Sequence, residues 1–340
     1  MTRNQKRLGG ALGQIRGVNQ CFTNGCLYAC GGLAVRNLSV IVPTRDRGAL
    51  LSRCLESIGE QTIRPRELII VDDSSAEDCR PVVPRDLLDI ATVIRLPKPT
   101  NAANARNVGI DAATGDIFAF VDSDDYWLSS HLEVACRALM EQQVDFLFGN
   151  FHAISESRSR WPAKIRTPVV PVNTAAYLTE QSGTIRTSTF VGRSAFIRSV
   201  KFDSKLAKHQ DWDFSLRAGR RGRVGFNQTA TVYIDHAPSC RMSGAANPEA
   251  SAYFLSKYKH DLPAKQWRYL FRRILKGASQ VSDQKACDDL LAKFRSVITF
   301  GDTSYARLCS LAAARPFLMN TARSVWRMRH LLNHHHPSKY

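Results

Sequence analysis

The sequence predicts an α/β fold with a mostly parallel sheet that is flanked by helices. Two observations support this fold class. Several short runs are continuously apolar and β-branched, without the polar alternation of a half-exposed strand. Such runs are typical of strands that are buried on both faces, as in parallel sheets. Segments with a helical period of apolar residues separate these runs, which favours right-handed βαβ units.

The expected elements follow one another from residue 38 onward. The first strand, "LSVIVP" (38–43), precedes a helix over 48–61 in which apolar residues recur at a helical period. Gly115 ends a helix that is rich in small residues. The further elements expected up to residue 150 are strands over 67–73, 91–96, 116–122 and 144–150 and helices over 101–113 and 129–142.

Residues 151–186 lose this rhythm and are interpreted as a connection to the segment 187–200. A short helix is expected over 211–222, and one or two strands over 224–236. Beyond residue 250 the pattern becomes helical. In "WRYLFRRILK" the apolar residues that share one helix face are Trp267, Leu270, Phe271, Ile274 and Leu275.

The net charge of +17 lies almost entirely in the two flanks of the chain. Residues 1–36 carry +5 and residues 251–340 carry +11, which leaves +1 for residues 37–250. We therefore expect a basic leader with little order over 1–36, a nearly neutral globular body over 37–250 and a basic helical extension over 251–340. Basic flanks of this kind suit an anionic partner, either nucleic acid or an acidic membrane surface.

The sequence favours a cytoplasmic protein. No apolar run approaches the roughly 20 residues of a membrane span. Arg16 interrupts the stretch that could serve as the core of a signal peptide, so neither a signal peptide nor a transmembrane helix is expected. The nine cysteines are odd in number and scattered, which indicates reduced thiols rather than a disulfide framework.

Three of the expected strands end in charged or polar residues, in the blocks "PTRDR", "DDSS" and "DSDD". In an open parallel sheet, ligands bind beyond the carboxyl ends of the strands, so the three blocks are expected to converge. If the third block is extended, Asp122 and Asp124 point to the same side. Two such carboxylates can hold one hard divalent cation. Taken alone, an acid after a strand is more often a turn former or a helix N-cap.

The glycines argue against two other nucleotide sites. A dinucleotide-binding turn needs G-x-G-x-x-G after the first strand, where this chain has "PTRDRGALL" with a single glycine. A Walker-type phosphate loop is also missing from the sequence. Without a glycine cradle, the charge of a pyrophosphate has to be neutralised in another way, and a cation held by carboxylates is the obvious means.

Three blocks together resemble glycosyltransferase family 2, whose members have the Rossmann-like GT-A fold. They are "LSVIVPTRDRGALLSRCLESIGEQTIRPRELIIVDDSS", "ARNVGIDAATGDIFAFVDSDDYW" and "HQDWDF", within roughly residues 37–245. The resemblance implies a nucleotide-sugar-binding half over 37–150 and an acceptor and catalytic half over 151–250. It also implies Mn²⁺ or Mg²⁺ as the cofactor.

The activity implied is that of an inverting hexosyl- or N-acetylhexosaminyl-transferase in polysaccharide or cell-envelope biosynthesis. Such an enzyme moves a sugar from a nucleoside-diphosphate sugar, commonly UDP-linked, to a hydroxyl of a glycan, a polysaccharide or a lipid-linked saccharide. Asp211 matches the general base of the family, although Gln210 stands where members usually have Glu. Pro99 and Asn101 likewise replace the usual Asn and Gly ahead of "ARN".

The resemblance further implies which residues contact the donor. Asp73 binds the base, Asp122 approaches the ribose and the metal, and Asp124 coordinates the metal. His236 and Arg241 match a loop that often closes over the diphosphate. The complete set of implied donor-binding residues is Pro43, Thr44, Arg45, Asp73, Arg106, Asp122, Ser123, Asp124, His236 and Arg241.

Structural roles remain open for several of these residues. Asp73 can be an N-cap, Asp211 can reflect the preference of helix N-termini for acids, and Arg106 can pair with an acid or a helix end. His236 can be a structural histidine. For the whole chain, the alternative is a non-catalytic protein that binds nucleotide sugars or nucleic acid through its basic flanks. The sequence contains no recognised nucleic-acid motif, so a nucleic-acid partner is not expected.

The basic amphipathic stretches over 264–276 and 317–332 also have two interpretations. They can pack on the catalytic body with their charges outward. Alternatively, they can lie on an anionic membrane at the inner face of the cell, with Trp267 and Trp326 as interfacial anchors.

Overall fold

A computed structural model describes residues 29–30, 33–34, 37–154, 160–162, 167–180, 183–235, 247–280 and 284–295. The expected basic leader lies outside the described residues, apart from two short strands. These strands, β1 (Ala29–Cys30) and β2 (Leu33–Ala34), pair with each other in antiparallel fashion.

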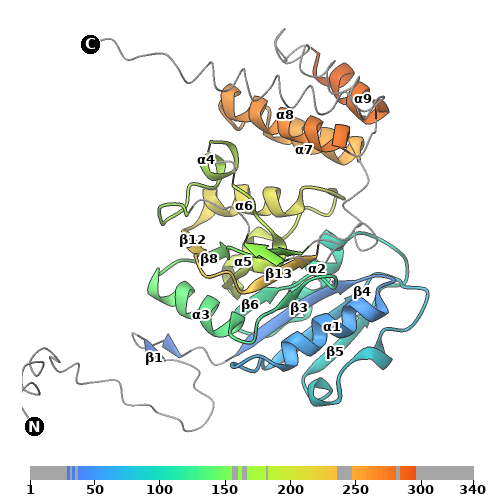
Figure 1. The fold of residues 1–340 in the computed structure, drawn as a ribbon, viewed down its shortest axis with the longest axis vertical. Coiled ribbons are helices and arrows are strands. Elements are labelled where there is room, and N and C mark those ends of the chain that lie inside the picture. The colour runs from blue at the N-terminus through green and yellow to red at the C-terminus, as the bar shows by residue number, and fades with distance from the viewer. Residues whose placement is uncertain are drawn as a thin grey trace, which may run out of the picture.

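A seven-stranded sheet forms the centre of the molecule, in the order β12-β8-β11-β6-β3-β4-β5 (Figure 1). Its strands are β3 (Leu38–Thr44), β4 (Glu67–Asp72), β5 (Ala91–Arg95), β6 (Ile117–Phe120), β8 (Phe146–Gly149), β11 (Val191–Arg193) and β12 (Val224–Asn227). Only β11 runs antiparallel to its two neighbours in this sheet, and the other pairings are parallel. The predicted mostly parallel sheet is therefore confirmed.

Helices cover both faces of this sheet. Along β3, Val40 and Val42 pack into one hydrophobic cluster together with α1 (Gly48–Gly59) and α3 (His131–Glu141). Ile41 points to the opposite face and joins a second cluster. The second cluster includes residues of α2 (Ala102–Ala112), α5 (Ser194–Val200) and α6 (Gln210–Arg221). Burial on both faces explains why this strand has no polar alternation.

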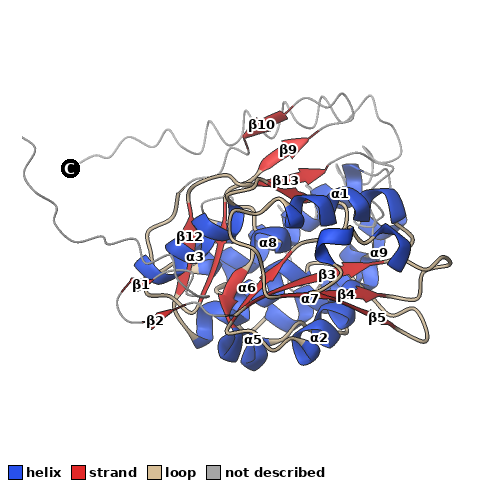
Figure 2. Ribbon diagram, turned by 90° about the horizontal axis from the view of Figure 1, so that it is seen from below, coloured by secondary structure: helices blue, strands red, loops and turns tan. Residues whose placement is uncertain are grey.

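A smaller sheet of four strands lies beside the large one, in the order β10-β9-β13-β7 (Figure 2). Its strands are β7 (Tyr126–Trp127), β9 (His152–Ile154), β10 (Arg160–Pro162) and β13 (Val232–Asp235). β7 follows the block "DSDD" directly, so the small sheet fixes the far end of that block. Three single-turn 3₁₀ helices, η1 (Arg80–Val82), η2 (Arg85–Leu87) and η3 (Thr187–Thr189), lie in connections.

Three further helices lie in the described part of the predicted C-terminal extension, although the first begins before residue 251: α7 (Pro248–Tyr258), α8 (Ala264–Gln280) and α9 (Gln284–Phe294). In Figure 1 they form a layer above α6 and above α4 (Thr174–Thr179), and α8 packs directly on α4. All five residues predicted for the apolar face of α8 are buried. This confirms, for residues 264–276, that the stretch packs on the body of the protein.

Trp267 is 3% exposed and donates its indole N–H to the carbonyl of Leu255, 2.8 Å away. The hypothesis that it anchors the protein at a membrane surface is therefore wrong. Trp326 and residues 317–332 lie outside the described residues. None of the described helices is both long and apolar enough to cross a membrane. The cysteines described as free are Cys54, Cys79, Cys136 and Cys287, and all four are buried.

Candidate active site

The ends of three strands meet at one edge of the large sheet. Thr44 at the end of β3 is in register with Asp72 of β4, and the N–H of Asp73 donates to the carbonyl of Thr44 over 2.8 Å. On the other side of β3, the N–H of Val121 donates to the carbonyl of Ile41 over 3.3 Å. The three blocks predicted to converge are thus brought together by the parallel pairing of β4, β3 and β6.

Three carboxylates gather just after β6. Oxygen atoms of Asp122, Asp124 and Asp125 lie within 4.8 Å of one another. The prediction of an extended segment is wrong here, because the N–H of Asp125 donates to the carbonyl of Asp122 over 2.9 Å and closes a turn. The carboxylates of Asp122 and Asp124 therefore converge through this turn rather than by alternation along a strand.

Each acid of this cluster has a partner. Asp124 forms an ion pair of 2.5 Å with Arg47, and Asp122 pairs with Arg106. Asp125 is 5% exposed and accepts hydrogen bonds from the hydroxyl of Ser188 (2.5 Å) and the N–H of Asp235 (3.1 Å).

Burial raises the pKa of Asp125 well above its ordinary value, and the charges of Asp124 and Asp122 raise it further. Burial and the neighbouring Asp122 likewise raise the pKa of Asp124. Carboxylates that repel one another in this way are stabilised in their charged form by a nearby cation. Because the donor set consists of carboxylate oxygens, a hard divalent ion such as Mg²⁺ or Mn²⁺ fits this cluster.

Arg106 connects the acid cluster to the start of α6. Its side chain is buried, and its Nη1 donates to Oε1 of Gln210 over 2.5 Å while its Nη2 pairs with Asp122. The structure confirms the interpretation in which Arg106 pairs with an acid. The amide oxygen of Gln210 is a good acceptor for the guanidinium, so Gln210 holds Arg106 at the start of α6.

Asp73 directly follows the carboxyl end of β4 and is buried beside the loop that follows β5. Its Oδ1 accepts hydrogen bonds from the N–H (2.8 Å) and the hydroxyl (2.6 Å) of Thr100. Next to Thr100, Asn101 caps α2 by accepting from the N–H of Asn104 over 3.0 Å. Asp73 thus fixes the loop that leads into α2, and its contact with a nucleobase stays a prediction.

Asp211 lies in the first turn of α6. Its side chain is 18% exposed, and its Oδ2 lies 3.7 Å from Nη1 of Arg186. Burial raises the pKa of Asp211 above its ordinary value, although the positive charge of Arg186 opposes this shift. A carboxylate whose pKa is raised is a stronger proton acceptor, provided that it is still ionised at the working pH.

The turn before α6 is held by the C-terminal extension. His209 has a left-handed backbone with a φ of 63°, which is uncommon for a residue other than glycine. Its Nε2 lies 2.9 Å from the hydroxyl oxygen of Ser251 in α7, and its ring packs against Trp212 and Phe254. Burial lowers the pKa of His209 to about 3, so its imidazole is neutral. α7 therefore helps to fix the backbone turn that positions Asp211 at the start of α6.

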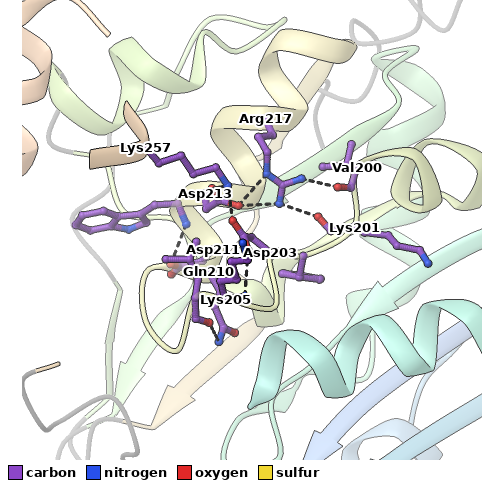
Figure 3. A network of polar contacts seen from close by, with 12 residues as sticks. Val200, Lys201, Asp203, Lys205, Gln210, Asp211, Asp213, Arg217 and Lys257 are labelled. Carbon is purple, nitrogen blue, oxygen red and sulfur yellow. Dashed lines mark hydrogen bonds and ion pairs between the residues drawn. The ribbon is translucent and has the colours of Figure 1, made fainter. Parts of the chain in front are cut away.

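A buried ionic network fixes the same first turn of α6, which also contains Asp213 (Figure 3). Asp213 is fully buried and pairs with Arg217 (2.7 Å) and with Lys257 of α7 (2.6 Å). The hydroxyl of Tyr258 donates a third contact to Asp213 over 2.8 Å. Lys257 also reaches Asp203 over 2.6 Å. Asp213 thereby ties the helix that carries Asp211 to the C-terminal extension.

Replacing Asp213 with Ala is expected to lower the free energy of unfolding by about 3–5 kcal/mol, because the partly buried Arg217 would lose its carboxylate partner and Lys257 would keep only Asp203. Chemical denaturation measures this change. The matched control is Asp89→Ala, since Asp89 is 62% exposed and pairs on the surface with Arg64. The control is expected to cost less than about 1 kcal/mol. Equal losses in the two variants would contradict a stabilising role for the buried network.

The remaining predicted donor residues are placed as follows. Pro43 and Thr44 are buried at the end of β3, and Ser123 is buried in the turn of the acid cluster. Arg45 is partly exposed and lies 3.6 Å from Asp46. His236 and Arg241 lie outside the described residues, so their proposed loop is not placed.

Sequence reasoning did not single out several residues that the structure brings to this edge. Arg47 ends the block "PTRDR", and its place after a strand end, two residues beyond Arg45, could have identified it as a site residue. Arg53 of α1 donates to the carbonyl of Asp124 over 2.6 Å and pairs with Asp235 over 3.1 Å. Arg186 and Ser188 belong to a segment without a periodic pattern, which offered no signal.

Comparisons with known proteins show that this chain is similar to glycosyltransferases. The model of Glycosyl transferase family 2 matches residues 39–204. An uncharacterized glycosyltransferase of Bacillus subtilis, YwdF, is 30% identical over 198 residues, which are 55% of this chain and 69% of the relative. The amylovoran biosynthesis glycosyltransferase AmsB of Erwinia amylovora is 32% identical over 197 residues, 55% of this chain and 65% of the relative.

A third relative is matched over a shorter region. It is the UDP-Glc:alpha-D-GlcNAc-diphosphoundecaprenol beta-1,3-glucosyltransferase WfgD of Escherichia coli, 28% identical over 35% of this chain and 47% of the relative. Among solved structures, S. aureus TarS 1–349 in complex with UDP-GlcNAc is similar, with a TM-score of 0.58 and 19% identity. The match covers 86% of this chain and 92% of that one, and it shows the shared GT-A fold.

Proposed function

Because the chain belongs to glycosyltransferase family 2, we propose that it is an inverting enzyme that moves a sugar from a nucleoside-diphosphate sugar to an acceptor hydroxyl. The donor is proposed to be UDP-linked, as in the name of the E. coli relative. The acceptor is proposed to be a hydroxyl of a glycan, a polysaccharide or a lipid-linked saccharide. The transferred group is a hexose or an N-acetylhexosamine.

One observation carries this proposal. A carboxylate cluster that fits a divalent cation and a separate, partly desolvated carboxylate lie at the same sheet edge, joined through Arg106. Arg106 pairs with Asp122 of the cluster and with Gln210, the residue before Asp211. A glycosyl transfer by direct displacement needs two such groups, one on the leaving-group side and one to activate the nucleophile.

The chemical step follows from the two groups. The carboxylate of Asp211 accepts the proton of the acceptor hydroxyl as its oxygen attacks the anomeric carbon of the donor sugar. The bond between this carbon and the diphosphate breaks, its electron pair leaves with the nucleoside diphosphate, and the configuration inverts. A Mn²⁺ or Mg²⁺ ion held by Asp122 and Asp124 would supply neutralising charge to the diphosphate. Asp125 keeps the turn in shape through its bonds to Ser188 and Asp235.

A screen of nucleotide sugars with and without Mn²⁺ tests this function. We expect UDP-sugars to raise the melting temperature only when Mn²⁺ or Mg²⁺ is present. A ligand at 100 times its dissociation constant stabilises the folded state by about 2.7 kcal/mol. The proposal fails if a folded sample is stabilised by no nucleoside diphosphate under either condition. Ligands that stabilise the protein are then tested for hydrolysis and transfer, since binding without turnover would favour the non-catalytic alternative.

A further inference from the structure

The short segment 183–189 brings a cation to the proposed base. Nη1 of Arg186 lies 3.7 Å from Oδ2 of Asp211, which is within ion-pair distance but too far for a hydrogen bond. Nε of Arg186 is buried and has no hydrogen-bond partner among the described residues. The guanidinium is thus attracted by Asp211, while its Nε–H has no acceptor among the described residues.

The fold holds Arg186 in this place. Its carbonyl accepts hydrogen bonds from both the N–H (3.0 Å) and the hydroxyl (2.7 Å) of Thr189. At the other end of the segment, Arg273 of α8 donates to the carbonyl of Gly183 over 2.8 Å. The guanidinium of Arg273 also lies over the ring of Trp212, 4.6 Å from its centroid. One arginine of the C-terminal extension therefore fixes the segment of Arg186 against the helix of Asp211.

Positive charge exceeds negative charge around Asp211. Burial lowers the pKa of Arg273, and the positive charge of the nearby Arg186 contributes to this shift. Arg106 is paired with Asp122, and Asp213 is paired with Arg217 and Lys257. This leaves Asp211 to face two arginines, Arg186 and Arg273. A site with surplus guanidinium charge favours an anionic ligand.

We propose that Arg186 binds a phosphate group of the acceptor, close to the hydroxyl that Asp211 deprotonates. The inference rests on the proposed function, because it takes Asp211 as the base. The attacking oxygen has to lie about 2.6–3.2 Å from the carboxylate of Asp211. Arg186, at 3.7 Å from the same carboxylate, is then within reach of the groups next to that hydroxyl.

Phosphate suits this position for two reasons. The planar fork of a guanidinium can bind two phosphate oxygens at once through two of its N–H groups, and the side chain of Arg186 is 36% exposed. The positive charge of Arg186 lowers the pKa of Asp211, and a phosphate bound at Arg186 would neutralise that charge. Binding of the acceptor would therefore make Asp211 a stronger base. The diphosphate of the donor is the other source of phosphate, and the experiment has to separate the two.

The experiment measures binding by calorimetry on the full chain saturated with UDP and Mn²⁺, so that the donor phosphate site is filled. The probes are N-acetylglucosamine 1-diphosphate with a short alkyl chain and the uncharged alkyl N-acetylglucosaminide. Wild-type protein is expected to bind the diphosphate about tenfold more tightly or better. Arg186→Gln should abolish this preference, Arg186→Lys should keep part of it, and Arg85→Gln, on the exposed η2 turn, should keep all of it.

The affinity for UDP separates the two phosphate sources. An Arg186→Gln protein that keeps its UDP affinity and loses the preference supports the acceptor role. If the variant instead binds UDP more weakly and keeps the preference, Arg186 serves the donor and the inference is overturned. A wild-type protein that binds UDP but does not distinguish the two probes overturns the inference alone. A wild-type protein that binds no nucleotide overturns the proposed function itself.

Discussion

Replacing Asp211 with Asn is expected to lower turnover by about two to four orders of magnitude while the donor still binds. General-base assistance contributes a factor of this size, and an amide cannot accept the proton. Asn is nearly isosteric with Asp, so its side-chain oxygen can keep the hydrogen bond that Asp211 accepts from the N–H of Trp212 over 2.9 Å. The local fold at the start of α6 is therefore expected to survive the change.

The pH profile gives a second measurement on the same variant. Only the ionised form of Asp211 can act as a base, so the rate falls as the pH drops through its pKa. Because burial raises that pKa, the acid limb should lie above the ordinary range of an aspartate. Asp211→Asn should lack this limb.

A control variant shows whether the loss is specific to Asp211. The control is Asp111→Asn, at an exposed position that pairs with Lys201. Near-normal turnover in Asp211→Asn, with donor binding intact, would refute the assignment of the base.

The strand ends were predictable because a parallel sheet imposes their convergence. Strands β3, β4 and β6 are buried on both faces, and this leaves an unmistakable apolar pattern in the sequence. Once they are parallel neighbours, the residues after each strand must meet. The turn at Asp122–Asp125 was not predictable in the same way, because its shape depends on Ser188 and Asp235, which are distant in the sequence.

The C-terminal extension contains a second feature that the apolar period of the sequence could not predict. The apolar face of α8 was visible in the sequence, but the pattern gave no position for Arg273. Arg273 lies at the border of this face, where its donors satisfy the carbonyls of Leu178 and Gly183. A guanidinium can be buried where backbone carbonyls surround it. Those carbonyls belong to a segment whose position no local pattern reveals.

Replacing Asp124 with Ala is expected to weaken Mn²⁺-dependent binding of UDP by about a hundredfold or more. The reason is the loss of a carboxylate ligand from a cluster in which the remaining acids, Asp122 and Asp125, are already engaged by Arg106 and Ser188. Changes in residues that merely support metal ligands already cost about 10–100-fold in affinity. Titration of Mn²⁺ with and without UDP, followed by calorimetry, measures the effect directly and does not require a known acceptor.

The change also breaks the ion pair between Asp124 and Arg47, whose side chains are 20% and 13% exposed, so the variant needs a matched control. Arg47→Gln removes the same ion pair and keeps the carboxylate. Because Arg47 and a cation compete for the oxygens of Asp124, this control should bind Mn²⁺ as tightly as the wild type or more tightly. If Arg47→Gln loses Mn²⁺ as severely as Asp124→Ala, the ion pair rather than a metal ligand explains the loss. If Asp124→Ala binds UDP normally both with and without a chelator, the acid cluster is not the metal site.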